Sequence, residues 1–262
     1  MKLSIISDEL SEDFQTAAEI GYSWGIRNFE IRNAWLSRVP GISNPGIEII
    51  KRTIKEYSLN ITTLSPGLFK IPLSSEELGY HRKELIQKTF RLAEELGVSC
   101  ITIFGLKRSP TDSANDYQRV IRVIGETASL AEREGFTLLL ENEAGWWADT
   151  GENTAKIVND IGSRALKLTW DPGNAFSAGE EPYPKGYNTV KDKIANIHIK
   201  MAVRNLDGKT CYLSEIGGYL DLKEQISALK QDNYQGYICI ETHQEPKIEQ
   251  SRKCLQILTK WV

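Results

Sequence analysis

The stretch Leu138-Leu139-Leu140-Glu141-Asn142-Glu143 is a short apolar run that ends abruptly on an acidic side chain. Three later runs repeat this pattern and place Asp171, His198 and Glu241 at or near their carboxyl ends. Each run has the length of a buried β-strand, about 4–8 residues, and each carries a side chain that can bind a metal. With the polar residues that follow them, the later runs are Leu166–Asp171, Ile194–Lys200 and Tyr237–Glu241.

Strand-like and helix-like segments alternate along the whole chain at intervals of roughly 30 residues, without a break in composition. Gly97, Gly135 and Gly162 stand where helical patterns stop, which is the usual place for a helix-terminating glycine. Alternation of this kind requires parallel strands joined by right-handed crossovers. The eight predicted strands cover residues 3–7, 28–32, 59–64, 98–104, 136–141, 166–170, 194–199 and 236–241.

Eight strand–helix units in 262 residues predict a single α/β domain over residues 1–262, folded as a closed (β/α)8 barrel, the TIM barrel. An open doubly wound sheet is the competing interpretation, but no strand is followed by GxGxxG or by a phosphate-binding loop with a lysine. Two stretches, 172–190 and 201–218, are expected to be long loops, the first because it is rich in proline and glycine.

Composition narrows the classes of partner. The formal charge is −3 and the pI is near 5.8, which argues against nucleic acid as the main partner. The amino-terminal residues turn polar too quickly for a signal peptide, and no apolar run approaches the roughly 20 residues of a membrane helix, so no membrane partner is expected. Four scattered cysteines without a CxxC pair are typical of reduced thiols in a cytoplasmic protein.

The barrel would bring the strand-end residues together, because the carboxyl ends of all its strands lie at one mouth. Glu141, Asp171, His198 and Glu241 would then converge from four consecutive strands. Carboxylates held this close repel one another unless a cation neutralises them. One imidazole among three carboxylates suits Mn²⁺, Co²⁺ or Zn²⁺, with Mg²⁺ less favoured. The sequence therefore predicts one divalent metal ion per chain.

The chain resembles the xylose-isomerase-like family of sugar and sugar phosphate isomerases and epimerases, and the resemblance covers essentially the whole chain. In that family the metal is held by Glu, Asp, His and Glu from strands five to eight, which implies the same four ligands here. Asn174 and Met201 depart from the pattern, since many relatives have His and Asp there. The most specific matching pieces are Glu141-Asn142, Trp170-Asp171-Pro172-Gly173-Asn174, His198-Ile199-Lys200 and Glu241.

The resemblance also implies a reaction, in which a proton moves at a carbon beside a carbonyl through a metal-bound enediolate. Glu141 and Glu241 would combine metal binding with catalysis, one removing the proton and the other returning it. The substrate would be a small sugar or sugar phosphate, and Asn174 could donate a hydrogen bond to one of its hydroxyls. The candidate substrate-binding residues are Asn174, Lys200, Arg204, Glu30, Arg32, Arg108, Trp146 and His243.

Other functions stay open on the same scaffold. An inosose-type dehydratase, a lyase, would use the same ligands. A relative of the apurinic-site endonucleases would need a histidine-rich three-metal cluster, and three histidines with an acidic pI argue against it. A sugar-binding barrel without catalysis is disfavoured because both glutamates are present. Family members often form dimers or tetramers, so a homodimer or homotetramer stays open as well.

Overall fold

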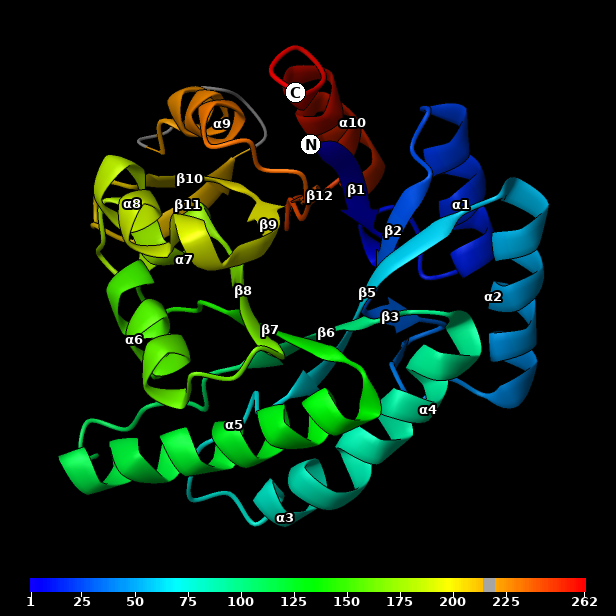
Figure 1. Ribbon diagram of the computed structural model, residues 1–262. Coiled ribbons are helices and arrows are strands. Elements are labelled where there is room, and N and C mark those ends of the chain that lie inside the picture. The colour runs from blue at the N-terminus through cyan, green and yellow to red at the C-terminus, as the bar shows by residue number, and fades with distance from the viewer. Residues whose placement is uncertain (214–219) are drawn as a thin grey trace.

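Eight parallel strands close into a ring in the computed structural model, which describes residues 1–213 and 220–262 (Figure 1). Each strand pairs with its neighbours in the chain, and β1 closes the ring on β12 with Lys2 opposite Tyr237. The predicted single α/β domain with a TIM barrel is therefore confirmed, and the open sheet is excluded. The barrel strands are β1 (Lys2–Ile6), β2 (Asn28–Ile31), β5 (Asn60–Leu68), β6 (Cys100–Phe104), β7 (Thr137–Glu141), β8 (Leu166–Trp170), β9 (Ile194–Ile199) and β12 (Tyr237–Ile240).

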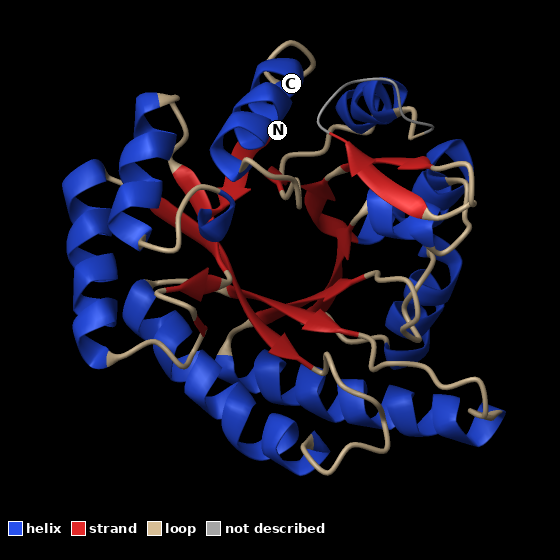
Figure 2. Cartoon of the chain, turned by 180° about the vertical axis from the view of Figure 1, so that it is seen from behind, coloured by secondary structure: helices blue, strands red, loops and turns tan. Residues whose placement is uncertain are grey.

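Helices surround the ring of strands (Figure 2), and local sequence signals fix their ends. α5 begins with a capping box between Ser113 and Asp116 and ends at Gly135, whose φ of 79° is left-handed. Gly97 and Gly162 end two other helices in the same way. The larger helices are α1 (Phe14–Ser23), α2 (Asn44–Tyr57), α4 (Ile86–Leu96), α5 (Ala114–Glu134), α6 (Gly151–Ile161), α9 (Leu222–Gln231) and α10 (Lys247–Leu258), and α4 follows the short segments α3 (Leu78–Tyr80) and η2 (His81–Leu85).

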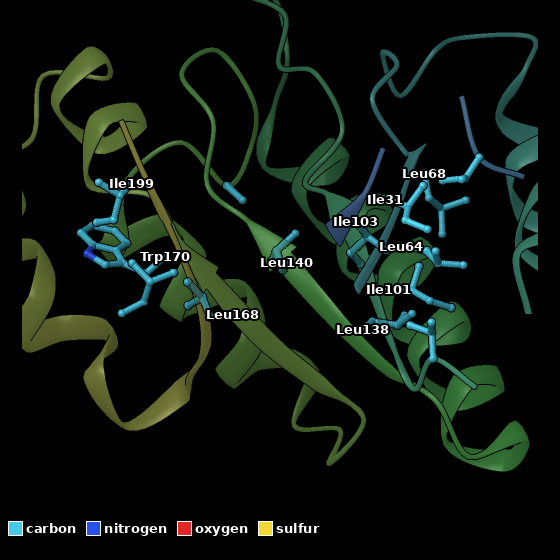
Figure 3. Close-up of a cluster of buried hydrophobic side chains, with 14 of the residues drawn as sticks. Ile31, Leu64, Leu68, Ile101, Ile103, Leu138, Leu140, Leu168, Trp170 and Ile199 are labelled. Atoms are coloured by element: carbon cyan, nitrogen blue, oxygen red, sulfur yellow. The ribbon is translucent and has the colours of Figure 1, made fainter. Parts of the chain in front are cut away.

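The two-residue period of a strand separates its apolar and polar side chains. Leu138 and Leu140 of β7 belong to the buried aliphatic layer, which neighbouring strands continue (Figure 3). Leu139 and Glu141 lie on the opposite face of the same strand, toward the barrel axis. Glu141 can therefore end an apolar run without entering the aliphatic layer that contains Leu138 and Leu140.

The expectation of a long loop over 172–190 is wrong. Asp171 caps a helix there, since its Oδ1 accepts a hydrogen bond of 2.8 Å from the Asn174 backbone N–H. Pro172 fits the first turn of that helix, where its missing N–H has no cost. The segments in this stretch are α7 (Pro172–Ser177), η3 (Pro182–Gly186) and α8 (Tyr187–Val190), with η4 (Lys191–Lys193) after them.

Three further features differ from the expectation. Part of the expected loop 201–218 is an antiparallel hairpin of β10 (Met201–Arg204) and β11 (Thr210–Leu213), while 214–219 lies outside the described residues. A short hairpin of β3 (Asn33–Ala34) and β4 (Ser37–Arg38) follows β2. β5 runs beyond its predicted end at residue 64 to Leu68, which pairs with Ile103 of β6 after a shift of register. Among the described residues, the helices are too short or too polar to cross a bilayer.

Candidate metal centre

The four predicted ligands meet at the carboxyl ends of neighbouring strands. Glu141 ends β7, His198 lies on β9, and Asp171 and Glu241 directly follow β8 and β12. One ligand atom from each lies within 4.8 Å of the other three, and all four side chains are buried. The Nδ1 atom of His198 is 3.3 Å from Glu141 Oε1 and 3.3 Å from Glu241 Oε2. This buried cluster indicates a divalent metal site.

Two cationic side chains partly balance the carboxylates. The Lys200 Nζ lies 2.7 Å from Asp171 Oδ2 and 2.9 Å from Glu241 Oε2. Arg32 donates a 2.7 Å hydrogen bond from Nη1 to Glu241 Oε1. Burial opposes ionisation of Glu241, but Lys200 and His198 hold its pKa well below the usual range. Burial raises the pKa of Asp171, and the charges of Glu241 and Glu141 add to that rise. Negative charge at the cluster is therefore only partly neutralised.

A fourth carboxylate, that of Glu30, contacts the other side of the imidazole. Glu30 Oε2 is 3.1 Å from His198 Nε2, and Asn196 donates a 2.7 Å hydrogen bond to Glu30 Oε1. Burial favours neutral imidazole, but Glu30, Glu141 and Glu241 raise the pKa of His198 well above its usual value. Carboxylates in this position orient a metal-binding histidine and increase its basicity. Glu30, which the sequence predicted as a substrate-binding residue, is fully buried, contacts His198, and is not among the residues that line the cavity over the cluster.

Asparagine side chains hold the Asp171 backbone in place. Asn142 donates from Nδ2 to the Asp171 carbonyl and accepts from the Asp171 N–H through Oδ1, both at 2.8 Å. Asn174 in turn donates from Nδ2 to the Asn142 carbonyl at 2.9 Å. The Asp171 carboxylate thus projects from a doubly fixed backbone, which is the kind of support that metal ligands require.

The donor set fits a divalent ion of intermediate hardness. Three carboxylates and one imidazole provide oxygen and nitrogen donors in the mixture that Mn²⁺, Co²⁺ and Zn²⁺ accept. Glu30 contacts the far nitrogen of the imidazole, and Asn142 fixes the backbone of Asp171. The sequence signal that predicted these ligands, a polar residue at the end of each apolar run, corresponds to their position at one rim of the ring.

A cavity of about 460 Å³ opens over the cluster, a size suited to a small ligand. Glu141, His198 and Glu241 line it, so three of the four candidate ligands face space where a substrate could bind. His243 is half-exposed, with its Nε2 3.3 Å from Glu241 Oε1. The predicted substrate-binding residues that line this cavity are Arg32, Asn174, Lys200 and His243.

The other three predicted substrate-binding residues either do not line this cavity or have a side chain outside the described residues. Arg108 is exposed, and its guanidinium lies 4.7 Å from the centre of the Trp147 ring rather than in the cavity. Trp146 packs near Lys70 and Lys107 and is not a lining residue. These loop positions carry no strand-end signal, so the sequence could not place their side chains. Arg204 ends β10, and its side chain lies outside the described residues.

The cavity also contains residues that the sequence did not reveal. Phe104 is the last residue of β6, the fourth barrel strand. The pattern that identified the metal ligands at the ends of other strands could therefore have identified it. Arg38 comes from the β3–β4 hairpin, and Lys70 follows β5, and neither position has a sequence signal. Lys70 pairs with Glu143 at 2.9 Å, and burial raises the pKa of Glu143. The additional lining residues are Ile6, Asn33, Arg38, Ser65, Lys70, Phe104 and Glu143.

Comparison with known proteins places the chain among enzymes of one family. The family profile described as a xylose isomerase-like TIM barrel matches residues 14–258. An inosose dehydratase of Lactiplantibacillus plantarum is 21% identical over 269 residues, covering 97% of this chain and 82% of that protein.

Solved structures share the fold at low identity. A D-allulose 3-epimerase from Methylomonas sp., in complex with D-allulose, superposes with a TM-score of 0.81 at 16% identity, covering 100% of this chain and 97% of that one. The structure described as the IOLI protein with a binding zinc atom has a TM-score of 0.84 at 17% identity, with 100% and 99% coverage. At these identities the structural likeness concerns the fold alone.

Proposed function

The chain belongs to the xylose isomerase-like TIM barrel family, and on this premise we propose that it is a divalent-metal-dependent isomerase or epimerase of a sugar or sugar phosphate. One observation carries the proposal. Glu141 and Glu241 come from opposite sides of β9 in the ring, both approach the same nitrogen of His198, and both open on one cavity. Two carboxylates around one reacting carbon are what proton removal and return require.

The metal would be held by Glu141, Asp171, His198 and Glu241, one ion per chain. When bound, it would supply positive charge that stabilises a negative oxygen on the substrate. Mn²⁺, Co²⁺ or Zn²⁺ suits the mixed donors better than Mg²⁺. The similar IOLI protein binds a zinc atom, which supports a divalent ion here.

In this proposal, the two glutamates remove and return the proton. Burial disfavours the charged form of Glu141, but His198 lowers its pKa, and Lys200 and His198 lower that of Glu241. Both side chains are therefore carboxylates near neutral pH and can accept a proton. His243, in contact with Glu241 and half-exposed, is placed to pass that proton to solvent. Asn174 and Lys200 line the cavity and would orient substrate hydroxyls.

A dehydratase is the second candidate. The similarity to the inosose dehydratase extends over 97% of this chain, and dehydration of a hydroxy ketone begins with the same proton removal beside a carbonyl. The two reactions differ in the next step. In the dehydratase a hydroxyl leaves the neighbouring carbon as water, whereas in the isomerase or epimerase a proton is returned to the substrate. Both functions therefore predict that this hydrogen is removed, either with exchange against solvent or with loss of water.

Solvent exchange tests both functions together. Mn²⁺-loaded protein is incubated in D₂O with ketoses, ketose phosphates and inososes, and deuterium incorporation is followed by NMR and mass spectrometry. Exchange without loss of water supports an isomerase or epimerase, whereas exchange with an unsaturated product supports the dehydratase. Absence of both exchange and an unsaturated product in every compound would overturn both.

A conservative variant tests the role of Glu241. Glu241→Gln keeps the shape of the side chain but removes the base, and loss of a general base typically lowers a rate by about 10²–10⁴-fold. The matched control is Glu134→Gln, an exposed residue of α5. Exchange at full rate in Glu241→Gln, with metal bound, would remove Glu241 from proton transfer.

A further inference from the structure

Among the residues that the structure describes, Arg38 is a cavity-lining cation without an acidic partner. Its Nε donates a 2.9 Å hydrogen bond to the Ser65 carbonyl, and its Nη2 donates a 3.1 Å hydrogen bond to Ser65 Oγ. Within the described part of the chain, Nη1 has no hydrogen-bond partner and no carboxylate forms an ion pair with this guanidinium. Arg38 nevertheless lines the cavity above the candidate metal centre.

The neighbouring cations of the cavity are already paired. Arg32 contacts Asp8, Glu9 and Glu241, and Lys200 contacts Asp171 and Glu241. Lys70 contacts Glu143. Arg38 differs from them because its two hydrogen bonds go to neutral oxygens of Ser65. Burial and the charge of Arg32 lower the pKa of Arg38, and the opposing charges of Glu141, Asp8 and Glu241 do not fully offset them.

The backbone of β5 is shaped to hold this guanidinium. Gly67 has a left-handed φ of 72°, and a Cβ at this position would lie 3.0 Å from Nε and 3.2 Å from the central guanidinium carbon of Arg38. Glycine thus allows β5 to approach the planar group closely. Ser65, on the same strand, fixes its orientation with two hydrogen bonds. Arg38 is therefore positioned with its remaining donors available.

We propose that Arg38 forms an anion subsite that binds a carboxylate or phosphate group of the substrate, which makes the substrate an acidic polyhydroxy carbonyl compound. A fixed guanidinium presents paired N–H donors that match either anion. A partly buried charge that lacks an internal partner gains most from a ligand that supplies one. This proposal rests on the proposed function, because the metal centre would bind the carbonyl end of the same molecule.

Pairs of ligands that differ in one anionic group test the subsite. Binding to the Mn²⁺-loaded protein is measured by isothermal titration calorimetry for D-fructose 6-phosphate against D-fructose, and for D-glucuronate against D-glucose. The acidic member of at least one pair is expected to bind about tenfold more tightly. A preference within the fructose pair indicates that the subsite binds phosphate, and a preference within the glucose pair indicates that it binds carboxylate. Equal binding within both pairs, or no binding at millimolar concentrations, overturns the subsite.

Variants assign the preference to Arg38. Arg38→Met should reduce it to about twofold or less, while Arg38→Lys should retain part of it through a single charged donor. Arg122→Met, on the exposed face of α5, should retain all of it. A full preference in Arg38→Met, with a normal melting temperature, excludes the subsite. Should Arg38→Met fail to fold, the Arg38→Lys result decides, because an unchanged preference across both pairs contradicts bidentate binding.

The same titrations distinguish this proposal from the proposed function. If the protein shows an acid preference that depends on Arg38 but catalyses neither solvent exchange nor loss of water, the subsite is retained and the isomerase or dehydratase activity is excluded. Exchange in neutral ketoses without any acid preference retains the activity and removes the subsite.

Discussion

The barrel mouth has an acidic half and a basic half. The acidic half runs from β7 through β8 and β9 to β12 and carries the four candidate metal ligands at the strand ends. The basic half, at β2 and β5, carries Arg38 on a hairpin and Lys70 on the segment after β5. In the acidic half the barrel itself sets the position of each side chain. In the basic half, local chain reversals set it.

The two halves differ in the contacts that hold their side chains as well as in charge. Asp171 is held by backbone hydrogen bonds with Asn142, and His198 by Glu30 beneath it. Arg38 relies on two bonds to one serine. Arg32 joins the halves, since it follows β2 but donates to Glu241. Substitutions in the acidic half should therefore affect metal binding most, and those in the basic half should affect substrate selection.

Removing a ligand should have the largest effect. Asp171→Ala is expected to abolish binding of Mn²⁺ at micromolar concentrations, because loss of even a residue that only supports a ligand typically costs about 10–100-fold in affinity. The measurement is the metal content of purified protein together with the rise in melting temperature on adding Mn²⁺. Asp192→Ala, at an exposed site, is the control. Retention of stoichiometric metal in Asp171→Ala would contradict the assigned centre.

Replacing Arg32, which joins the two halves, should have the second-largest effect. Arg32→Met leaves Asp8, Glu9 and Glu241 without their shared cation, and breaking a buried ion pair typically destabilises a protein by about 3–5 kcal/mol. Urea unfolding of metal-free protein measures the loss. Arg122→Met should change the free energy of unfolding by less than about 0.5 kcal/mol. A similarly small change in Arg32→Met would show that the carboxylates are balanced without it.

Weakening the support under the imidazole should have a smaller effect. Glu30→Gln keeps a hydrogen-bonding group beside His198 but removes its charge, so Mn²⁺ affinity should fall about 10–100-fold. Titration calorimetry measures the affinity, with Glu134→Gln as the control. If Glu30 contacted substrate instead, metal affinity would stay unchanged and only the apparent substrate affinity would fall.

The smallest effect is a dependence of metal affinity on pH. The carboxylates raise the pKa of His198 in the folded, metal-free protein, so its proton stabilises the fold below pH about 6.5. That stability is lost as the pH rises through the raised pKa. A metal must displace the same proton, so affinity should increase about tenfold per pH unit until His198 deprotonates. Calorimetry in buffers of different ionisation enthalpy counts the released protons. An affinity that does not vary with pH would exclude His198 as a ligand.

The sequence could predict the acidic half because its signal is local. An apolar run that ends on Glu141 identifies both a strand and its mouth-facing residue, and the same holds for Asp171, His198 and Glu241. How far along the barrel axis a side chain lies was harder to predict from the sequence. Glu30 and Arg32 face the same way, but Glu30 is still paired within β2 while Arg32 lies beyond it. One therefore supports the centre from below and the other reaches it.

The basic half depends on contacts that no local pattern encodes. Arg38 enters the cavity because a turn at Trp35 and Leu36, both with positive φ, folds β4 back on β3. Its placement further requires Gly67, on a later strand, to leave room. Such a pairing of distant positions becomes visible only in three dimensions. The order of strands was therefore predictable, whereas the position of Arg38 in the cavity was not.

The ammonium group of Lys200, seated between Asp171 and Glu241, has a consequence for how this protein matures. Structural zinc domains stay unfolded until their ion arrives, because their ligands have no other partner. Here a covalently attached cation already holds two of the ligands together. We therefore expect the chain to fold before it binds an ion, so that metal-free protein would be folded and a later supply of metal could fill the site.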